Sequence, residues 1–289
     1  MCDALGIINF EDACVDITGL MDYRPASAIS FLGRYRLIDF MLSNMTNSGI
    51  SQIEVFIKDK PRSLIEHLGN GRQYNINSKR GRLSILYGEN RIMSEVYNHD
   101  IANFMDNIQY IEEVNKPYVI IAPSYMIYQI DFNEVLKYHA EKNSDVTVIY
   151  KSTDNAKEEF IGCDTLSMDK DKRIVAFEKN RGKYKTRNVS LEAYVMTKKL
   201  FLELVRKAAN TSSLYWFKDI LADSCDDLRI NGYAFKGTVY CINSLRSYFK
   251  ANIELRTHAK ARELFKEDWP IHTRTNDSAP SQYMPEAKI

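Results

Sequence analysis

Two short stretches of the sequence combine residue types that could bind a phosphate group. Gly69-Asn70-Gly71-Arg72 is a glycine-rich turn beside a cation, and the backbone amides of such a turn can receive an anion. A surface loop explains the same residues, and we favour that plainer interpretation. Arg34 and Arg36 lie close to Asp39 in the sequence. These two cations either clamp an anion or pair with neighbouring carboxylates, and the sequence leaves both interpretations open.

Other signatures of catalysis or cofactor binding are missing from the sequence. It contains no dinucleotide-binding glycine motif, no P-loop, no HExxH or CxxC pair and no GxSxG nucleophile motif. No histidine stands near Cys241, so we expect a small buried thiol there and not a nucleophile. Packing or surface roles are expected for the histidines, which lack metal-ligand spacing: His67, His99, His139, His258 and His272.

The composition is that of an ordinary globular protein. Hydrophobic residues make up 45% of the 289 residues and charged residues 27%, which excludes disordered and collagen-like classes. Lys and Arg number 39 against 38 Asp and Glu, so no basic excess is available for binding nucleic acid. The most apolar stretch, around residues 118–128, is interrupted by Pro123 and is far shorter than the roughly 20 residues that cross a bilayer. Since the N-terminus lacks a signal-peptide pattern and the five cysteines are scattered, we expect a cytoplasmic protein that binds no membrane.

Apolar residues recur alternately at strand spacing and at helix spacing along the chain. Asp131 and Glu134 form a possible capping pair at the start of one helix, and Gly49 marks the end of another. The expected elements are strands over residues 5–9, 53–57, 118–122, 146–150 and 173–177, and helices over 37–45, 132–139 and 200–208. This order predicts an α/β fold with a doubly wound, mostly parallel sheet and helices on both faces. Ligands in such sheets bind at the carboxyl ends of the strands, so the loops after the first and third strands are the predicted site.

The end of the chain differs from the rest. After Trp269, a run of Pro, Asn, Asp and Ser residues breaks any helical or strand period. We therefore divide the chain into a main domain over residues 1–268 and a segment over residues 269–289. That segment is a linker or the first turns of a further domain.

Two parts of the sequence resemble the bacterial glucose-1-phosphate adenylyltransferase family. Residues 31–40, FLGRYRLIDF, and residues 43–50, SNMTNSGI, are similar to its signature PFGGKYRIIDFxLSNxxNSGI. Residues 247–255, SYFKANIEL, are similar to the family's SYWEANMDL. Shorter similarities follow in the family's order at residues 128–132, 177–179, 218–221 and 269–271. The resemblance implies a Rossmann-like nucleotidyltransferase domain over residues 1–268 and the truncated start of a left-handed β-helix domain over 269–289.

Members of this family make ADP-glucose from ATP and glucose 1-phosphate, with a Mg²⁺ held by two aspartates. The resemblance puts the first aspartate position at Ser124 or Tyr125 and the second at Cys241. None of these side chains supplies the hard anionic oxygen that Mg²⁺ prefers. Ordinary adenylyl transfer is therefore not expected.

The resemblance also assigns other nucleotide-binding positions to unsuitable residues. The family's glycine-rich phosphate loop corresponds to residues 7–12, which end in Glu11 and Asp12 and would repel phosphate. The lysine before the signature corresponds to Ala26, and a glycine and an aspartate of the nucleotide segment correspond to His99 and Ala102.

One branch of the family shows this pattern, namely the D-type subunit of Gram-positive bacteria. The resemblance implies a non-catalytic or weakly active regulatory subunit in glycogen biosynthesis, whose partner is a catalytic C-type subunit. It further implies a sugar phosphate or a nucleotide as effector. No cofactor is expected, and Mg²⁺ would bind only if catalysis is retained.

Three residues are candidates for a vestigial ligand site. Lys179 resembles the lysine that binds glucose 1-phosphate, although a solvated surface lysine is an equal alternative, and Glu178 is expected to support or pair with it. Arg34 is the third candidate. The alternative function is an active sugar-phosphate nucleotidyltransferase with a relocated metal site at Asp131 or Asp164. Because one coil of a β-helix cannot bury its own core, residues 272–289 are expected to be extended and loosely held.

Overall fold

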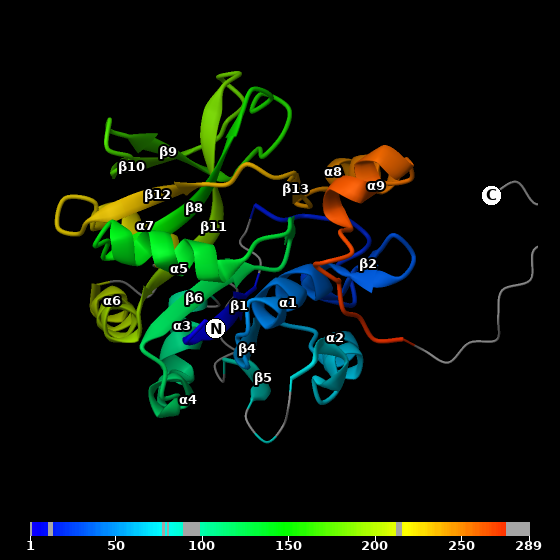
Figure 1. Cartoon of the computed structure of the whole chain (residues 1–289), viewed down its shortest axis with the longest axis horizontal. Coiled ribbons are helices and arrows are strands. Elements are labelled where there is room, and N and C mark those ends of the chain that lie inside the picture. The colour runs from blue at the N-terminus through cyan, green and yellow to red at the C-terminus, as the bar shows by residue number, and fades with distance from the viewer. Residues whose placement is uncertain are drawn as a thin grey trace, which may run out of the picture.

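The computed structural model describes residues 2–10, 14–76, 79, 81–88, 99–211 and 216–275 (Figure 1). Its strands are β1 (Ala4–Asn9), β2 (Ser30–Phe31), β3 (Tyr35–Arg36), β4 (Gln52–Ile57), β5 (Arg82–Tyr87), β6 (Tyr118–Pro123), β7 (Met126–Ile127), β8 (Val146–Thr153), β9 (Asp164–Met168), β10 (Ile174–Lys179), β11 (Arg187–Thr197), β12 (Ile230–Ala234) and β13 (Tyr240–Cys241). Its helices are α1 (Leu37–Asn47), α2 (Arg62–Leu68), α3 (Asp100–Asp106), α4 (Ile108–Glu113), α5 (Phe132–Glu141), α6 (Lys198–Thr211), α7 (Phe217–Asp223), α8 (Leu245–Glu254) and α9 (His258–Leu264), with 3₁₀ turns η1 (Ala26–Ala28) and η2 (Arg72–Tyr74). No helix within these described ranges has the length and apolar character that a membrane crossing requires.

A nine-stranded sheet runs through the molecule in the order β10-β9-β11-β6-β1-β4-β5, with β8 paired to β11 and β12. Strands β6, β1, β4 and β5 are parallel to one another. The long strand β11 is antiparallel to β6, β8 and β9. The predicted α/β fold with a mostly parallel central sheet is confirmed, and β10 and β11 are the strands that run against the others.

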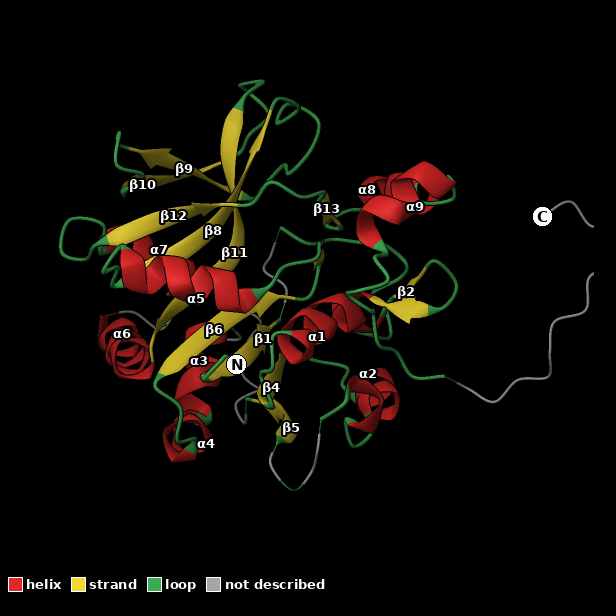
Figure 2. Cartoon of the chain, viewed as in Figure 1, coloured by secondary structure: helices red, strands yellow, loops and turns green. Residues whose placement is uncertain are grey.

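Helices cover both faces of the sheet (Figure 2). Side chains alternate along β1, because successive residues of a strand point to opposite faces. Ala4 and Ile8 belong to one hydrophobic core, which includes buried residues of α1 and α5. Leu5 and Ile7 belong to a second core, which includes buried residues of α3, α6 and α7. This two-core arrangement is the doubly wound architecture that the sequence predicts.

The C-terminal end of α1 holds several distant segments together. The Asn44 side chain donates to the Tyr128 carbonyl at 2.8 Å and accepts from the N–H of Ile130 and from Trp269 Nε1. Gly49 follows with φ +86, and its N–H donates to the Thr46 carbonyl. This left-handed turn confirms the predicted helix end. The family-like stretch over residues 43–50 thus has a structural role in this chain.

The segment after Trp269 packs against α1. Asn47 Nδ2 donates to the Pro270 carbonyl, and the His272 N–H donates to Ser43 Oγ at 2.8 Å. Thr273 Oγ1 donates to Asp39 Oδ2 at 2.6 Å. The expectation of a loosely held chain from residue 272 onward is therefore wrong for residues 272 and 273, because their backbone and side chains find buried partners on α1. Residues 276–289 lie outside the described residues.

The helix start at Asp131 also differs in detail. Asp131 Oδ1 accepts from the Asn133 N–H at 2.9 Å and so caps α5 as expected. Glu134 was expected to reach back to the cap, but its carboxylate accepts from the Tyr233 hydroxyl at 3.5 Å. Because the Glu134 side chain lies toward β12, it does not complete a capping box with Asp131.

Candidate functional site

The residues at the two family aspartate positions lie side by side in the fold. Cys241 in β13 pairs with Met126 in β7, which follows Tyr125 directly. The N–H of Ile242 donates to the Tyr125 carbonyl at 2.9 Å. Two segments far apart in the sequence therefore meet at the place where the family's two aspartates would share a metal ion. In this chain they carry the phenol of Tyr125 and the thiol of Cys241. Ser124, the other possible first position, is buried as well.

Three thiols gather at this point. Cys163 Sγ lies 3.6 Å from Cys241 Sγ. Cys14 interacts with Cys163, and this hydrogen bond together with burial raises the pKa of Cys14 far above its ordinary value. A thiol held protonated in this way is a poor metal ligand and a poor nucleophile. Across the described ranges, no group of three or more His, Cys, Asp or Glu side chains is arranged to hold a metal ion.

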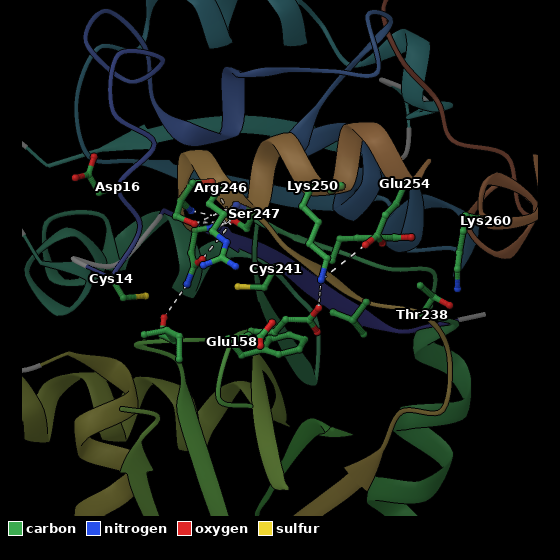
Figure 3. A pocket seen from close by; sticks show the side chains of 18 residues that line it. Cys14, Asp16, Glu158, Thr238, Cys241, Arg246, Ser247, Lys250, Glu254 and Lys260 are labelled. Atoms are coloured by element: carbon green, nitrogen blue, oxygen red, sulfur yellow. Dashed lines mark hydrogen bonds and ion pairs between the residues drawn. The ribbon is translucent and has the colours of Figure 1, made fainter. Parts of the chain in front are cut away.

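A cavity of about 600 Å³ opens beside the thiols, between α8 and the loops around residues 158–161 and 238–244 (Figure 3). Its volume is that of a small-molecule site. Lys250 lies between two carboxylates, with Nζ 2.5 Å from Glu159 and 3.7 Å from Glu254. The charged residues of the lining are four carboxylates and three cations, namely Asp16, Glu158, Glu159, Glu254, Arg246, Lys250 and Lys260. Because carboxylates are in excess, this cavity is unfavourable for a triphosphate.

The carboxyl ends of β1 and β6 enclose a much smaller space, of about 20 Å³. Asp100 closes it from one side, since its carboxylate accepts from Asn9 Nδ2 and from the Phe217 N–H, both at 3.0 Å. The rings of Phe10 and Trp216 meet edge-on with centroids 6.0 Å apart. The space holds about one water molecule, whereas ligand pockets usually measure about 300–1,000 Å³. The position at which the fold class predicts a ligand is therefore filled by side chains.

Lys218 and Glu192 line this small space, and Asp164 lies beside Lys218. Lys218 Nζ lies 3.7 Å from Asp164 Oδ2 and 3.9 Å from Glu192 Oε1. All three side chains are nearly buried, with 9–11% of their surface exposed. Both distances are longer than a hydrogen bond, so these two carboxylates act on the Lys218 cation through charge.

Burial shifts the pKa values of these groups toward neutrality. It raises the pKa of Asp100 and of Glu192 to about 7 and the pKa of Asp164 to about 6. It lowers the pKa of Lys218 to about 8. The charge of Lys179 acts against the rise at both Asp164 and Glu192. The cluster therefore changes its protonation around neutral pH.

The predicted vestigial ligand residues are not brought together. Lys179 lies opposite Asp164 in the β9–β10 pairing and is exposed. Glu178 pairs with Arg187, at 3.5 Å, and not with Lys179, because neighbouring residues of a strand point to opposite faces. Arg34 is exposed in the β2–β3 turn, with its guanidinium 5.7 Å from the centre of the Tyr35 ring. Figure 1 places β2 and β10 on opposite sides of the molecule.

The two possible phosphate-binding stretches have structural explanations. Gly69 ends α2 with φ +51, and Gly71 precedes η2 with φ +77, so this stretch forms the surface turn that we favoured. The Arg36 guanidinium donates to the Ala28 carbonyl and to Ser30 Oγ, so it is engaged within the fold. The Asp39 carboxylate accepts hydrogen bonds from the Arg36 N–H, the Tyr74 hydroxyl and Thr273 Oγ1.

The other positions compared with the family are also part of the packing. Ala26 is buried in η1. His99 caps α3, because its Nδ1 accepts from the Ala102 N–H at 3.3 Å. Glu11 and Asp12 lie outside the described residues.

The two carboxylates suggested for a relocated metal site are engaged separately. Asp131 caps α5 and accepts from both the N–H and the Nδ2 of Asn133. Asp164 faces Lys218. No contact in the described part of the chain joins these carboxylates into a common site.

Glu192 and Lys218 are the site residues that sequence reasoning did not assign. Lys218 stood in a family-like stretch without a role. Glu192 is the one charged residue within the apolar run of β11, over residues 189–196, and that contrast is the signal that could have pointed to it.

Comparison with known proteins agrees with this architecture. A family model described as "Nucleotidyl transferase" matches residues 19–257. A glucose-1-phosphate adenylyltransferase from Thermosipho africanus is 31% identical over 267 residues, which cover 91% of this chain and 64% of the relative. A glycogen biosynthesis protein GlgD from Geobacillus stearothermophilus is 31% identical over 292 residues, which cover 99% of this chain and 73% of the relative. The chain thus spans about two thirds of the length of these relatives.

The chain belongs to the nucleotidyl transferase family, whose model it matches from residue 19 to residue 257. Within that family, it is similar to glucose-1-phosphate adenylyltransferases and to the GlgD protein. The resemblance found in the sequence is confirmed.

Proposed function

We propose that this chain is a regulatory subunit, with little or no catalysis of its own, that acts with a catalytic glucose-1-phosphate adenylyltransferase subunit in glycogen biosynthesis in the cytoplasm. The observation that supports this most is the space of about 20 Å³ at the carboxyl ends of β1 and β6. A nucleotide cannot enter it without displacing buried side chains.

The groups at the family aspartate positions add to the argument. Tyr125 and Cys241 meet through the β7–β13 pairing, yet neither offers an anionic oxygen to a divalent cation. Removing even one well-placed electrostatic group costs roughly 10²–10³ in rate. Two such losses at one position favour a role other than turnover.

What the chain retains also favours assembly. Asn44 and Asn252 belong to family-like stretches, and both support the fold: Asn252 Oδ1 accepts from the Leu32 N–H at 3.1 Å. A regulatory subunit needs the family fold for docking and an effector site, while it can lose the metal site. A sugar phosphate or a nucleotide is the effector that we propose.

The test is pyrophosphate release from ATP and glucose 1-phosphate in the presence of Mg²⁺. We expect the purified chain alone to stay far below about 1 s⁻¹, the lower end of ordinary turnover numbers. Turnover by the chain alone at an ordinary rate, lost together with Mg²⁺ on adding a chelator, would contradict the proposal.

A further inference from the structure

A small cavity lies at the amino ends of β4 and β5, at the opposite edge of the sheet from the strand ends described above. Its volume is about 150 Å³, which is more than one water molecule needs and less than a drug-sized ligand fills. Gln52 and Glu54 are two residues apart on β4 and therefore point to the same face of the sheet. Arg82 lies opposite Gln52 on β5, and Tyr110 and Glu113 of α4 add to the polar lining. The cavity thus has the size and the polarity of a site for a small polar ligand.

Two oxygen atoms in this lining lack a donor. Glu54 is only 4% exposed, and its Oε2 makes no hydrogen bond with any described residue. The same is true of Gln52 Oε1, which is also buried. A buried acceptor without a donor is costly, because it has lost the hydrogen bonds that water would provide. The cavity therefore offers two acceptors to a ligand that carries N–H groups.

The charge of the lining favours a cation. Burial raises the pKa of Glu54 to about 7, although the charges of Arg82 and Lys198 act against this rise. Arg82 is exposed, with its guanidinium 5.9 Å from the centre of the Tyr110 ring, and it donates to neither unpartnered oxygen. Glu113 adds a second carboxylate to the lining. When Glu54 is ionised, the lining therefore carries more negative than positive charge.

We propose that this cavity binds a small alkylguanidinium cation, whose N–H groups donate to Gln52 Oε1 and Glu54 Oε2. A guanidinium suits two acceptors on one face of a strand, because its donors form a planar fork that can bond two oxygen atoms at once. The inference concerns the β4–β5 edge of the sheet and does not depend on the regulatory role proposed above.

The test is a titration of the full chain with methylguanidinium, followed by calorimetry and by the NMR signals of the backbone amides. We expect saturable binding of one cation per chain, with the largest shifts in β4, β5 and α4. Tetramethylammonium is the matched probe, since it has the same charge but no N–H donor. It should bind at least about tenfold more weakly, because hydrogen bonds to a charged group are lost.

Variants of the lining separate the two acceptors. Gln52→Leu removes one acceptor at similar size and should weaken methylguanidinium binding at least about fivefold. Glu54→Gln keeps the size but removes the charge, and should weaken it at least about tenfold. Arg82→Met removes a competing cation and should tighten binding. Glu141→Gln, an exposed change on α5, is the control and should bind as the natural chain does.

Two results would overturn the proposal. One is a folded natural chain, verified by circular dichroism, that shows no saturable binding of methylguanidinium or binds tetramethylammonium equally well. The other is binding that stays unchanged in Gln52→Leu, a half-buried position where the substitution leaves the buried Glu54 in place. In either case, the cavity would hold water alone.

Discussion

Asp39 is a buried carboxylate that accepts hydrogen bonds from four directions. Its donors are the Arg36 N–H, the Tyr74 hydroxyl, His67 Nε2 and Thr273 Oγ1. The carboxylate is fully buried, so these donors replace all of its water. It thereby connects α1 with α2, η2 and the segment after Trp269.

We expect Asp39→Ala to destabilise the chain by about 3–5 kcal/mol, because several buried donors would lose their acceptor at once. Thr273→Val removes one donor and should cost only about 1 kcal/mol. Urea unfolding of both variants measures the difference. Equal, small losses in the two variants would contradict the role of Asp39.

The buried carboxylates predict a pH dependence of stability. In the unfolded chain they titrate near pH 4, whereas in the folded chain the pKa of Glu192 and Asp100 is about 7 and that of Asp164 about 6. Between these values the folded chain holds protons that the unfolded chain has lost, so stability falls as the pH rises from about 4 to 7. Lys218 acts in the opposite sense, because its folded pKa of about 8 lies below its ordinary 10.5, and stability rises above pH 8.

We therefore expect the loss of unfolding free energy between pH 5 and 7.5 to be smaller in Glu192→Gln than in the natural chain, by about 1–3 kcal/mol. Denaturant titrations at the two pH values measure it. The same loss in both proteins would show that Glu192 does not titrate in this range.

At the level of single residues, the sequence could predict that the family's two metal-binding aspartates are replaced. It could not predict the cluster of Lys218, Asp164 and Glu192. Tyr125 and Cys241 were identified from motif positions, and the fold brings them together. Glu178 and Lys179 are neighbours in sequence, yet strand alternation separates them. Contacts of Lys218 with Asp164 and Glu192 depend on three separate elements, so no local pattern could predict them.

The packing of β1 on α1 leaves no room for a side chain at Gly6. A Cβ there would lie 2.7 Å from Met45 Sδ and 3.3 Å from side-chain atoms of Ile50 and Ile53. We expect Gly6→Ala to cost about 1–3 kcal/mol through overpacking. Thermal and urea unfolding test this.

The end of the Met45 side chain is the flexible partner in that contact. Combining Gly6→Ala with Met45→Ala should therefore cost less than the sum of the two single changes, because the smaller side chain makes room. Strictly additive losses would mean that the contact does not limit the packing.

At the level of elements, the long periodic segments were predictable and the short ones were not. Strands β1, β4 and β6 and helices α1, α5 and α6 follow clear apolar periods. Strands β7 and β13 have two residues each, which is too short for a period. The position of the segment after Trp269 was missed for another reason: its hydrogen bonds to Ser43 and Asp39 are long-range contacts.

At the level of the whole molecule, the fold and the site lead to different expectations. The doubly wound sheet with its two cores is that of a nucleotidyl transferase. The space at the strand ends is closed, whereas the cavity beside α8 is open but lined by more carboxylates than cations. The closed space and the carboxylate-rich cavity are the basis of the regulatory role that we propose.

The most direct test of the central claim is a titration of a catalytic glucose-1-phosphate adenylyltransferase subunit with this chain, with the rate of pyrophosphate release as the readout. We expect the rate, or its response to effectors, to change and to saturate at a fixed ratio of the two chains. Heat-denatured chain serves as the control and should have no effect. A catalytic rate that stays the same at every ratio, with and without effectors, would contradict the regulatory role.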